Sequence, residues 1–281
     1  MNRETFLGDL RAFWAATLKE WRILRRYKGS FLSFVFWPIA LPLAYVYQAE
    51  AFSAGRADTT AAFADRAGTN EIAGFLFVGW ATYMWLSIIL WGPGTSLRTE
   101  QIRGSLEAIF LTPASRLVVL FGPIVSQLIW ALWIFLVVGV ALRIGFGVEL
   151  GVAETARGLA VIIVGIPALY AIGALFAAVV LRFGDASALV QVVRGLFTAV
   201  CGMSFPVVVL PDLAQRLAAV LPPTYLIADM RAVLLAGAGM GRIVGDLAIL
   251  AVMGAILAVV AVVAFRHTEL HARRGGRLAQ Y

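Results

Sequence analysis

Six long apolar runs dominate the pattern of hydrophobic and polar positions along the chain. A membrane-spanning helix needs about 20 mostly apolar residues, because the hydrocarbon core of a bilayer is about 30 Å thick. The runs meet that length and hold no Asp, Glu, Lys or His near their middles. The predicted spans are 29–49, 72–93, 117–141, 158–181, 188–210 and 243–265. The pattern therefore predicts an all-α, polytopic membrane protein with six transmembrane helices.

A different periodicity precedes the first span. In residues 4–28, large apolar side chains recur every three or four positions, and basic side chains occupy the other surface. The apolar face carries Phe6, Leu10, Phe13, Trp14, Leu18, Trp21 and Leu24, and the basic surface carries Arg11, Lys19, Arg22, Arg25 and Arg26. This pattern favours an amphipathic helix lying in the membrane interface, and the alternative is a soluble helix packed on a partner.

Composition supports the membrane class. The chain of 281 residues is 61% hydrophobic and 14% charged, whereas soluble domains have about 45–50% apolar and about 25% charged residues. The net charge is +7, and most of the basic residues flank the apolar spans. This placement indicates membrane loops and not a nucleic-acid partner. Sixteen of the 23 Lys and Arg residues fall on the side that holds both termini. This bias predicts that both termini are cytoplasmic, in agreement with an even number of spans.

The chain is expected to form a single transmembrane domain over residues 1–281. Its parts are an interfacial helix at 1–28, a six-span bundle at 29–265 and a cytoplasmic tail at 266–281.

Several catalytic classes find no support in the sequence. The two lysines, Lys19 and Lys28, follow Leu18 and Tyr27, so no phosphate-binding loop with Gly-Lys-Ser/Thr exists. His267 and His271 are one helical turn apart, but a zinc peptidase needs Glu after the first His and a third ligand. The apolar spans lack the acidic and basic relays of ion-coupled carriers. We therefore expect no enzyme activity, no metal and no cofactor in this chain.

The segment between the second and third spans, residues 98–116, is longer than a simple connector needs to be. Glu100 and Glu107 are two helical turns apart and share one face, with Arg103 beside them. The segment is long enough to present a surface to a partner.

This segment resembles the membrane subunits of ABC-2 type exporters. That family has a pattern of Glu-x-x-x-Gly-Thr/Ser-Leu-Glu-x-Leu/Ile-x-x-Thr/Ser-Pro. The chain matches it in register at Glu100, Gly104, Ser105, Leu106, Glu107, Ile109, Thr112 and Pro113. The resemblance implies that this segment, with Arg103, holds the coupling helix that docks on an ATPase subunit.

A second match lies between the last two spans. The family has a proline-punctuated element there, followed by Leu-Pro-x-Thr-Tyr and a helix that bears an arginine. Pro206 is expected to kink the fifth span, Pro211 to end it, and Pro222-Pro223 to turn the chain back. The stretch is too short and too charged to cross the membrane, so the resemblance implies two short re-entrant helices capping the pathway. The expected gate residues are Pro206, Leu210, Pro211, Leu221, Pro222, Pro223, Tyr225 and Arg231. Arg231 could instead be an interfacial anchor.

The resemblance implies the permease subunit of an ATP-driven exporter in a prokaryotic plasma membrane. Its expected partners are a separate ATPase subunit that binds ATP and Mg, a second permease copy or a paralogue, and membrane lipids. The substrate could be lipid-like, a drug or a glycan. The aromatic residues Trp80, Tyr83, Trp85 and Trp91 could line a sugar path or form an interface belt with lipid-facing rings. The alternative class is a membrane channel or receptor-like protein without a motor.

Overall fold

The computed structural model is helical and contains no strand in the part of the chain that it describes. The described residues are 3–26, 28–53, 63–69, 71–92, 95, 100, 102, 104, 124–145, 147, 151–183 and 186–274. This arrangement confirms the predicted all-α class.

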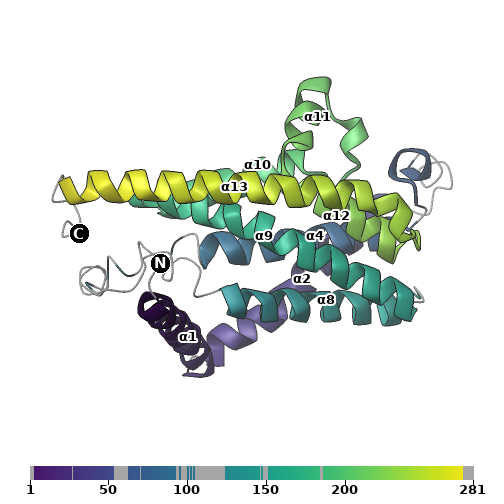
Figure 1. Cartoon of the computed structure of the whole chain (residues 1–281). Coiled ribbons are helices and arrows are strands. Elements are labelled where there is room, and N and C mark those ends of the chain that lie inside the picture. Colours follow the sequence, from purple (N-terminus) through teal and green to yellow (C-terminus); the bar gives the residue numbers. More distant parts are fainter. Residues whose placement is uncertain are drawn as a thin grey trace.

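The N-terminal helix is separate from the bundle that follows it. Helix α1 (Arg3–Arg26) lies at an angle to α2 (Lys28–Ser53), as Figure 1 shows, and it contacts α2 and α8 (Ile124–Gly145). On its free side Leu10, Trp14 and Trp21 are all exposed. The predicted amphipathic helix therefore exists, and part of its aromatic face has no cover within the described chain.

The centre of the bundle is α4 (Ile72–Trp91). From Gly74 to Leu90 every residue except Ile88 is buried, because α4 packs against α2, α8, α9 (Val152–Phe183), α10 (Ala186–Val200) and α12 (Pro222–Leu234). A helix that is apolar on all sides is stable when protein or lipid surrounds it. In this bundle the neighbouring helices provide that cover for α4.

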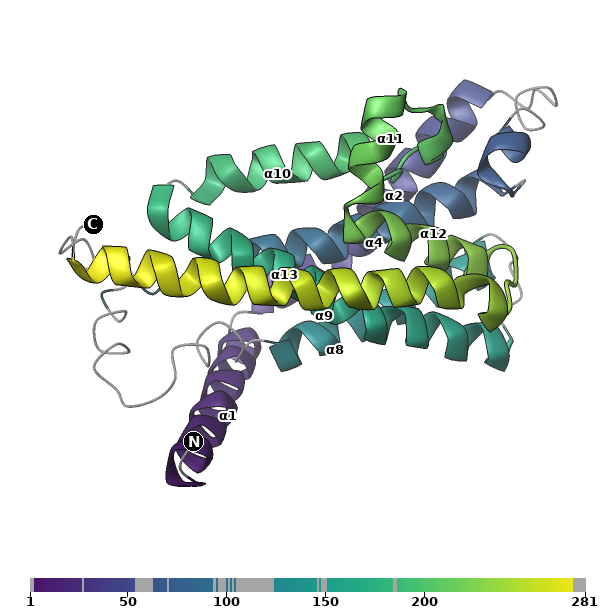
Figure 2. The same cartoon turned by 45° about the horizontal axis from the view of Figure 1, so that its top comes forward.

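Two long helices, α9 and α13 (Met240–Arg274), lie side by side in Figures 1 and 2 and make the most extensive helix contact. They approach closely at Gly254, where an added Cβ would lie 3.1 Å from the backbone nitrogen of Ala168. The opposite side of α13 is exposed at Val252, Ile256, Val259 and Val263. An apolar stripe of this kind requires lipid or protein to cover it.

Among the described residues, three helices are long and apolar enough to cross a membrane, namely Phe63–Trp91, Val152–Val180 and Met240–His267, and a bent helix pair would make a fourth. Helices α2 and α8 overlap the first and third predicted spans. The count of six spans remains a prediction.

The fifth predicted span, 188–210, is wrong at its C-terminal end. Helix α10 stops at Val200, and Pro206 and Pro211 lie outside it. The reason is Gly202, whose φ of +74° places it in the left-handed region, with its Cα facing the Val207 side chain. The chain turns at this glycine, and the 15 residues of α10 span only about 22 Å.

Candidate functional site

Residues 203–235, here called the re-entrant element, form short helices as predicted. A 3-10 turn (Val207–Val209) leads to α11 (Asp212–Ala219), and α11 meets α12 at an angle of 88°. Pro206 and Pro211 have extended backbone conformations before their helices. Pro222 and Pro223 open α12, where a missing N–H leaves no hydrogen bond unmade. The prolines thus set where each short helix begins.

Two polar side chains hold the bend together. Gln215 donates from Nε2 to the carbonyl oxygens of Val208 at 3.2 Å and Leu210 at 2.8 Å. Tyr225 donates its hydroxyl to the carbonyl of Ala219 at 2.9 Å. These acceptors have no partner in a regular helix, so the side chains satisfy groups that the bend would otherwise leave unpaired. Leu210 and Leu221, also expected gate residues, are half-buried.

Arg231 points inward, so the interpretation of this residue as an interfacial anchor is wrong. Its Nε donates to the Phe75 carbonyl at 3.0 Å, and its two terminal nitrogens donate to Gly202 at 2.6 Å and Met203 at 2.7 Å. The guanidinium carbon lies 3.3 Å from the centroid of the Phe75 ring. Arg231 therefore joins α12, the start of α4 and the turn after α10.

The approach of these three segments depends on Gly79 of α4. A Cβ at Gly79 would lie 2.1 Å from the Met203 carbonyl oxygen and 2.3 Å from a terminal nitrogen of Arg231. Any larger side chain would force the turn away from α4. Cys201, the single cysteine of the chain, is 1% exposed beside this contact.

Asp229 lies two residues before Arg231 and is 2% exposed. Its Oδ2 atom has no hydrogen-bond partner among the residues that the structure describes. Arg231 does not neutralise it, since side chains two positions apart point to different sides of a helix.

The predicted coupling segment, residues 98–116, is described at only three positions. Glu100 is 8% exposed and forms an ion pair with Lys19 of α1. Ile102 is exposed, and Gly104 adopts a φ of +71° in a turn. The expected coupling residues outside the described residues are Arg103, Ser105, Leu106, Glu107, Thr112 and Pro113. The ion pair between Lys19 and Glu100 therefore links α1 directly to this segment.

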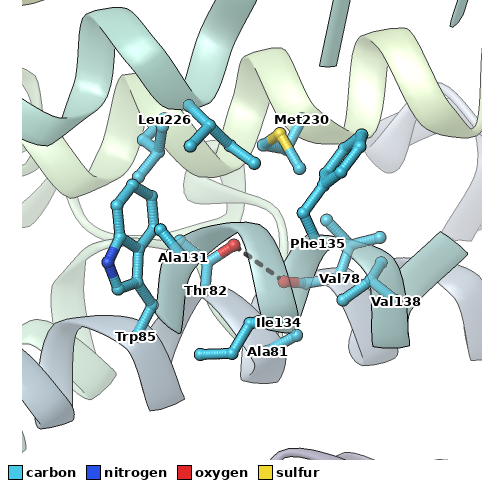
Figure 3. Close-up of a pocket in the computed structure, with 11 residues that line it drawn as sticks. Val78, Ala81, Thr82, Trp85, Ala131, Ile134, Phe135, Val138, Leu226 and Met230 are labelled. Atoms are coloured by element: carbon cyan, nitrogen blue, oxygen red, sulfur yellow. Dashed lines mark hydrogen bonds between the residues drawn. The ribbon is translucent and has the colours of Figure 1, made fainter. Parts of the chain in front are cut away.

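The interior of the bundle offers little space. Figure 3 shows an apolar cavity between α4, α8, α9 and α12, lined by residues such as Val78, Trp85, Phe135 and Leu226. Its volume is about 20 Å³, which is room for about one water molecule. The Thr82 hydroxyl in its wall donates to the Val78 carbonyl at 2.9 Å. Sites for drug-sized molecules measure about 300–1,000 Å³, so this cavity cannot hold a transported molecule.

The aromatic residues of α4 do not form a lipid-facing group. Trp80, Tyr83 and Trp85 are buried, and only Trp91, at the helix end, is exposed. Trp80 stacks on Tyr45 of α2 at a centroid distance of 3.7 Å. The prediction of lipid-facing rings is therefore wrong for three of the four, because the whole of α4 lies inside the bundle.

The bundle and its three helices of membrane-spanning length define a polytopic α-helical membrane protein. A family profile described as ABC-2 family transporter protein matches residues 47–263. Since the match covers most of the chain, the protein belongs to this family, as a permease component of an ABC transporter, and the resemblance is confirmed. No curated protein matches the chain.

Proposed function

We propose that this chain is the permease subunit of an ATP-driven exporter that moves a lipid-like, drug or glycan substrate out of the cytoplasm. The observation that carries the proposal is the span of the family match. Residues 47–263 include both the segment around Gly104 and the whole re-entrant element. Energy would come from a separate ATPase subunit that binds ATP and Mg, because the chain has no phosphate-binding loop.

The proposed path for the substrate lies between two permease chains, either two copies or a copy and a paralogue. The cavity between α4, α8, α9 and α12 is too small for a substrate, which supports a path outside the single chain. Exposed apolar residues on α10 and α11, such as Val192, Leu196 and Leu213, also require a cover. The protein would lie in a prokaryotic plasma membrane, with both termini in the cytoplasm and α1 against the lipid interface.

In this proposal, closure of the ATPase dimer displaces the segment at residues 100–113. The Lys19–Glu100 ion pair would pass that displacement to α1, and α1 contacts α2 and α8. Packed helices have discrete arrangements, so a local shift can be converted into opening of the path. The re-entrant element would close the opposite end.

Co-purification with the ATPase encoded beside the gene tests the proposal. The variant Leu106→Asp/Glu107→Arg should release the ATPase while the permease stays folded. The control, Arg242→Glu, reverses the charge of an exposed residue on α13 and should leave binding intact. If no ATPase binds the unmodified chain, the motor-driven function is refuted and a channel or receptor-like role takes its place.

A further inference from the structure

Arg194 is half-buried near the middle of α10. It follows the start of α10 at Ala186 by eight residues, which is about 12 Å. Its guanidinium lies 5.1 Å from the ring centroid of Tyr83 in α4. Tyr83 precedes Trp91, the exposed last residue of α4, also by eight residues and again about 12 Å. The contact between Arg194 and Tyr83 therefore lies about two helical turns inside the end of each helix.

The hydrogen bonds of this guanidinium are incomplete. One terminal nitrogen donates to Oε1 of Gln191, one turn earlier, at 3.4 Å. The buried Nε atom has no partner in the described residues. Within that same part of the chain the ion pairs are Lys19–Glu100 and Arg157–Glu154, and no carboxylate pairs with Arg194. The cation is thus balanced only by the Tyr83 ring and one weak hydrogen bond.

The surroundings exclude a location against lipid tails. Gln191, Val192, Gly195 and Leu196 form an exposed face of α10 next to Arg194, and Figure 2 shows α10 at the edge of the bundle. Within a membrane, a cation normally faces protein or a water-filled cavity, because hydrocarbon cannot solvate it. This face of α10 is therefore covered by something other than lipid tails when the protein is in a membrane.

We propose that Arg194 and Gln191 form a recognition site for an oxyanion, such as a phosphate or carboxylate, on an amphipathic substrate. This inference rests on the proposed export function and names the substrate class. Because Oε1 of Gln191 accepts from Arg194, the amide nitrogen of Gln191 remains free to donate beside the guanidinium. The two groups present several N–H donors on one surface, a geometry that suits planar or tetrahedral oxyanions. The exposed side chains of Val192 and Leu196 would contact the apolar chain of the same molecule.

The test measures lipid binding by native mass spectrometry of the full chain in a neutral detergent. The probes are phosphatidylglycerol and phosphatidylcholine with identical acyl chains. The unmodified chain should bind phosphatidylglycerol at one saturable site, about tenfold or more tightly than phosphatidylcholine. Arg194→Gln should remove that preference and leave phosphatidylcholine binding unchanged. Gln191→Leu should lower the preference for phosphatidylglycerol only severalfold, because it removes the amide donor but keeps the stronger, charged hydrogen bonds of the guanidinium. Arg242→Gln, at an exposed position of α13, is the control and should not alter it.

Inorganic phosphate separates two sources of the anion. Competition by phosphate would show that the oxyanion alone is recognised, and lack of competition that the apolar chain is also required; both results support the site. If Arg194→Gln keeps the preference for phosphatidylglycerol, the inference is overturned. The inference is also overturned if the only effect of Arg194→Gln is to dissociate paired permease chains, because that result would show that a carboxylate of the second chain neutralises Arg194. Binding is measured without the ATPase, so failure here leaves the exporter role standing, and the co-purification can fail while this site holds.

Discussion

Replacing Arg231 by methionine is expected to release the re-entrant element from α4 while the rest of the bundle stays folded. Methionine keeps much of the length of the side chain but donates no hydrogen bond. The carbonyls of Gly202 and Met203, which lie outside regular helices, would lose their donor. Each orphaned buried carbonyl costs about 1–3 kcal/mol. Relief of the desolvation of the arginine offsets part of this, so we expect a net local destabilisation of about 2–3 kcal/mol.

The assay uses the only cysteine of the chain as a natural reporter. Cys201 is 1% exposed and immediately precedes Gly202, so a maleimide reaches its thiol only when the contact opens. The labelling rate then follows the population of the open state. A local destabilisation of about 2–3 kcal/mol corresponds to labelling about 30- to 150-fold faster. Arg231→Lys, which keeps the charge but has fewer directed donors, should give an intermediate rate.

Two further variants separate this effect from general damage. Gly79→Ala keeps Arg231 but places a methyl group 2.1 Å from the Met203 carbonyl oxygen, so it should also accelerate labelling. Arg242→Gln removes an exposed arginine and should not. Tryptophan fluorescence on heating checks that each variant remains folded. Slow labelling in both Arg231→Met and Gly79→Ala would refute the reasoning, because the contact would then not control access to Cys201.

Three other substitutions have defined outcomes. Lys19→Glu places a second carboxylate beside Glu100 and should weaken coupling to ATP hydrolysis, whereas the exchange Lys19→Glu/Glu100→Lys should restore it. ATPase rates of the complex measure both variants. The ion pair is partly exposed, so we expect it to contribute about 1 kcal/mol. Gly254→Leu should destabilise the α9–α13 contact by about 1–3 kcal/mol, as measured by thermal unfolding. Gly245→Leu should not, because nothing lies within 4 Å of its added Cβ. Equal losses of stability in the two variants would contradict the packing argument. Tyr225→Phe removes one partly exposed hydrogen bond and should lower the free energy of unfolding by only about 0.5–1 kcal/mol, so a larger loss in denaturant titrations would contradict this assignment.

The parts of the fold that depend on local pattern could be read from the sequence. The apolar run at residues 72–93 predicts the helix α4, and the change from an amphipathic to a uniformly apolar pattern separates α1 from α2. Pro222 and Pro223 mark the turn in the re-entrant element because proline fixes φ and removes a donor wherever it occurs. These signals need no knowledge of distant residues.

The parts that depend on distant residues could not be predicted. Helix α10 ends before Pro206 because Gly202 takes a left-handed conformation, and glycine in a sequence permits that conformation without requiring it. Arg231 and Phe75 are 156 residues apart, and Lys19 and Glu100 are 81 apart. A signal for Arg231 did exist, since a charged residue within an apolar stretch needs a partner, but only the fold shows that its partners are carbonyl groups.

Two arginines, Arg231 and Arg194, show how the same side chain can indicate structure in one place and a binding site in another. All three nitrogens of Arg231 donate to backbone carbonyls of the same chain, so its role is to hold segments of the fold together. Arg194 has a ring on one side, one long hydrogen bond, and a neighbouring exposed helix face. The fold is thus able to supply backbone carbonyl acceptors to a guanidinium, as it does for Arg231. The unfinished contacts of Arg194 therefore point to a partner outside the described bundle, and an oxyanion at the surface of α10 supplies the charge and acceptors that this guanidinium lacks.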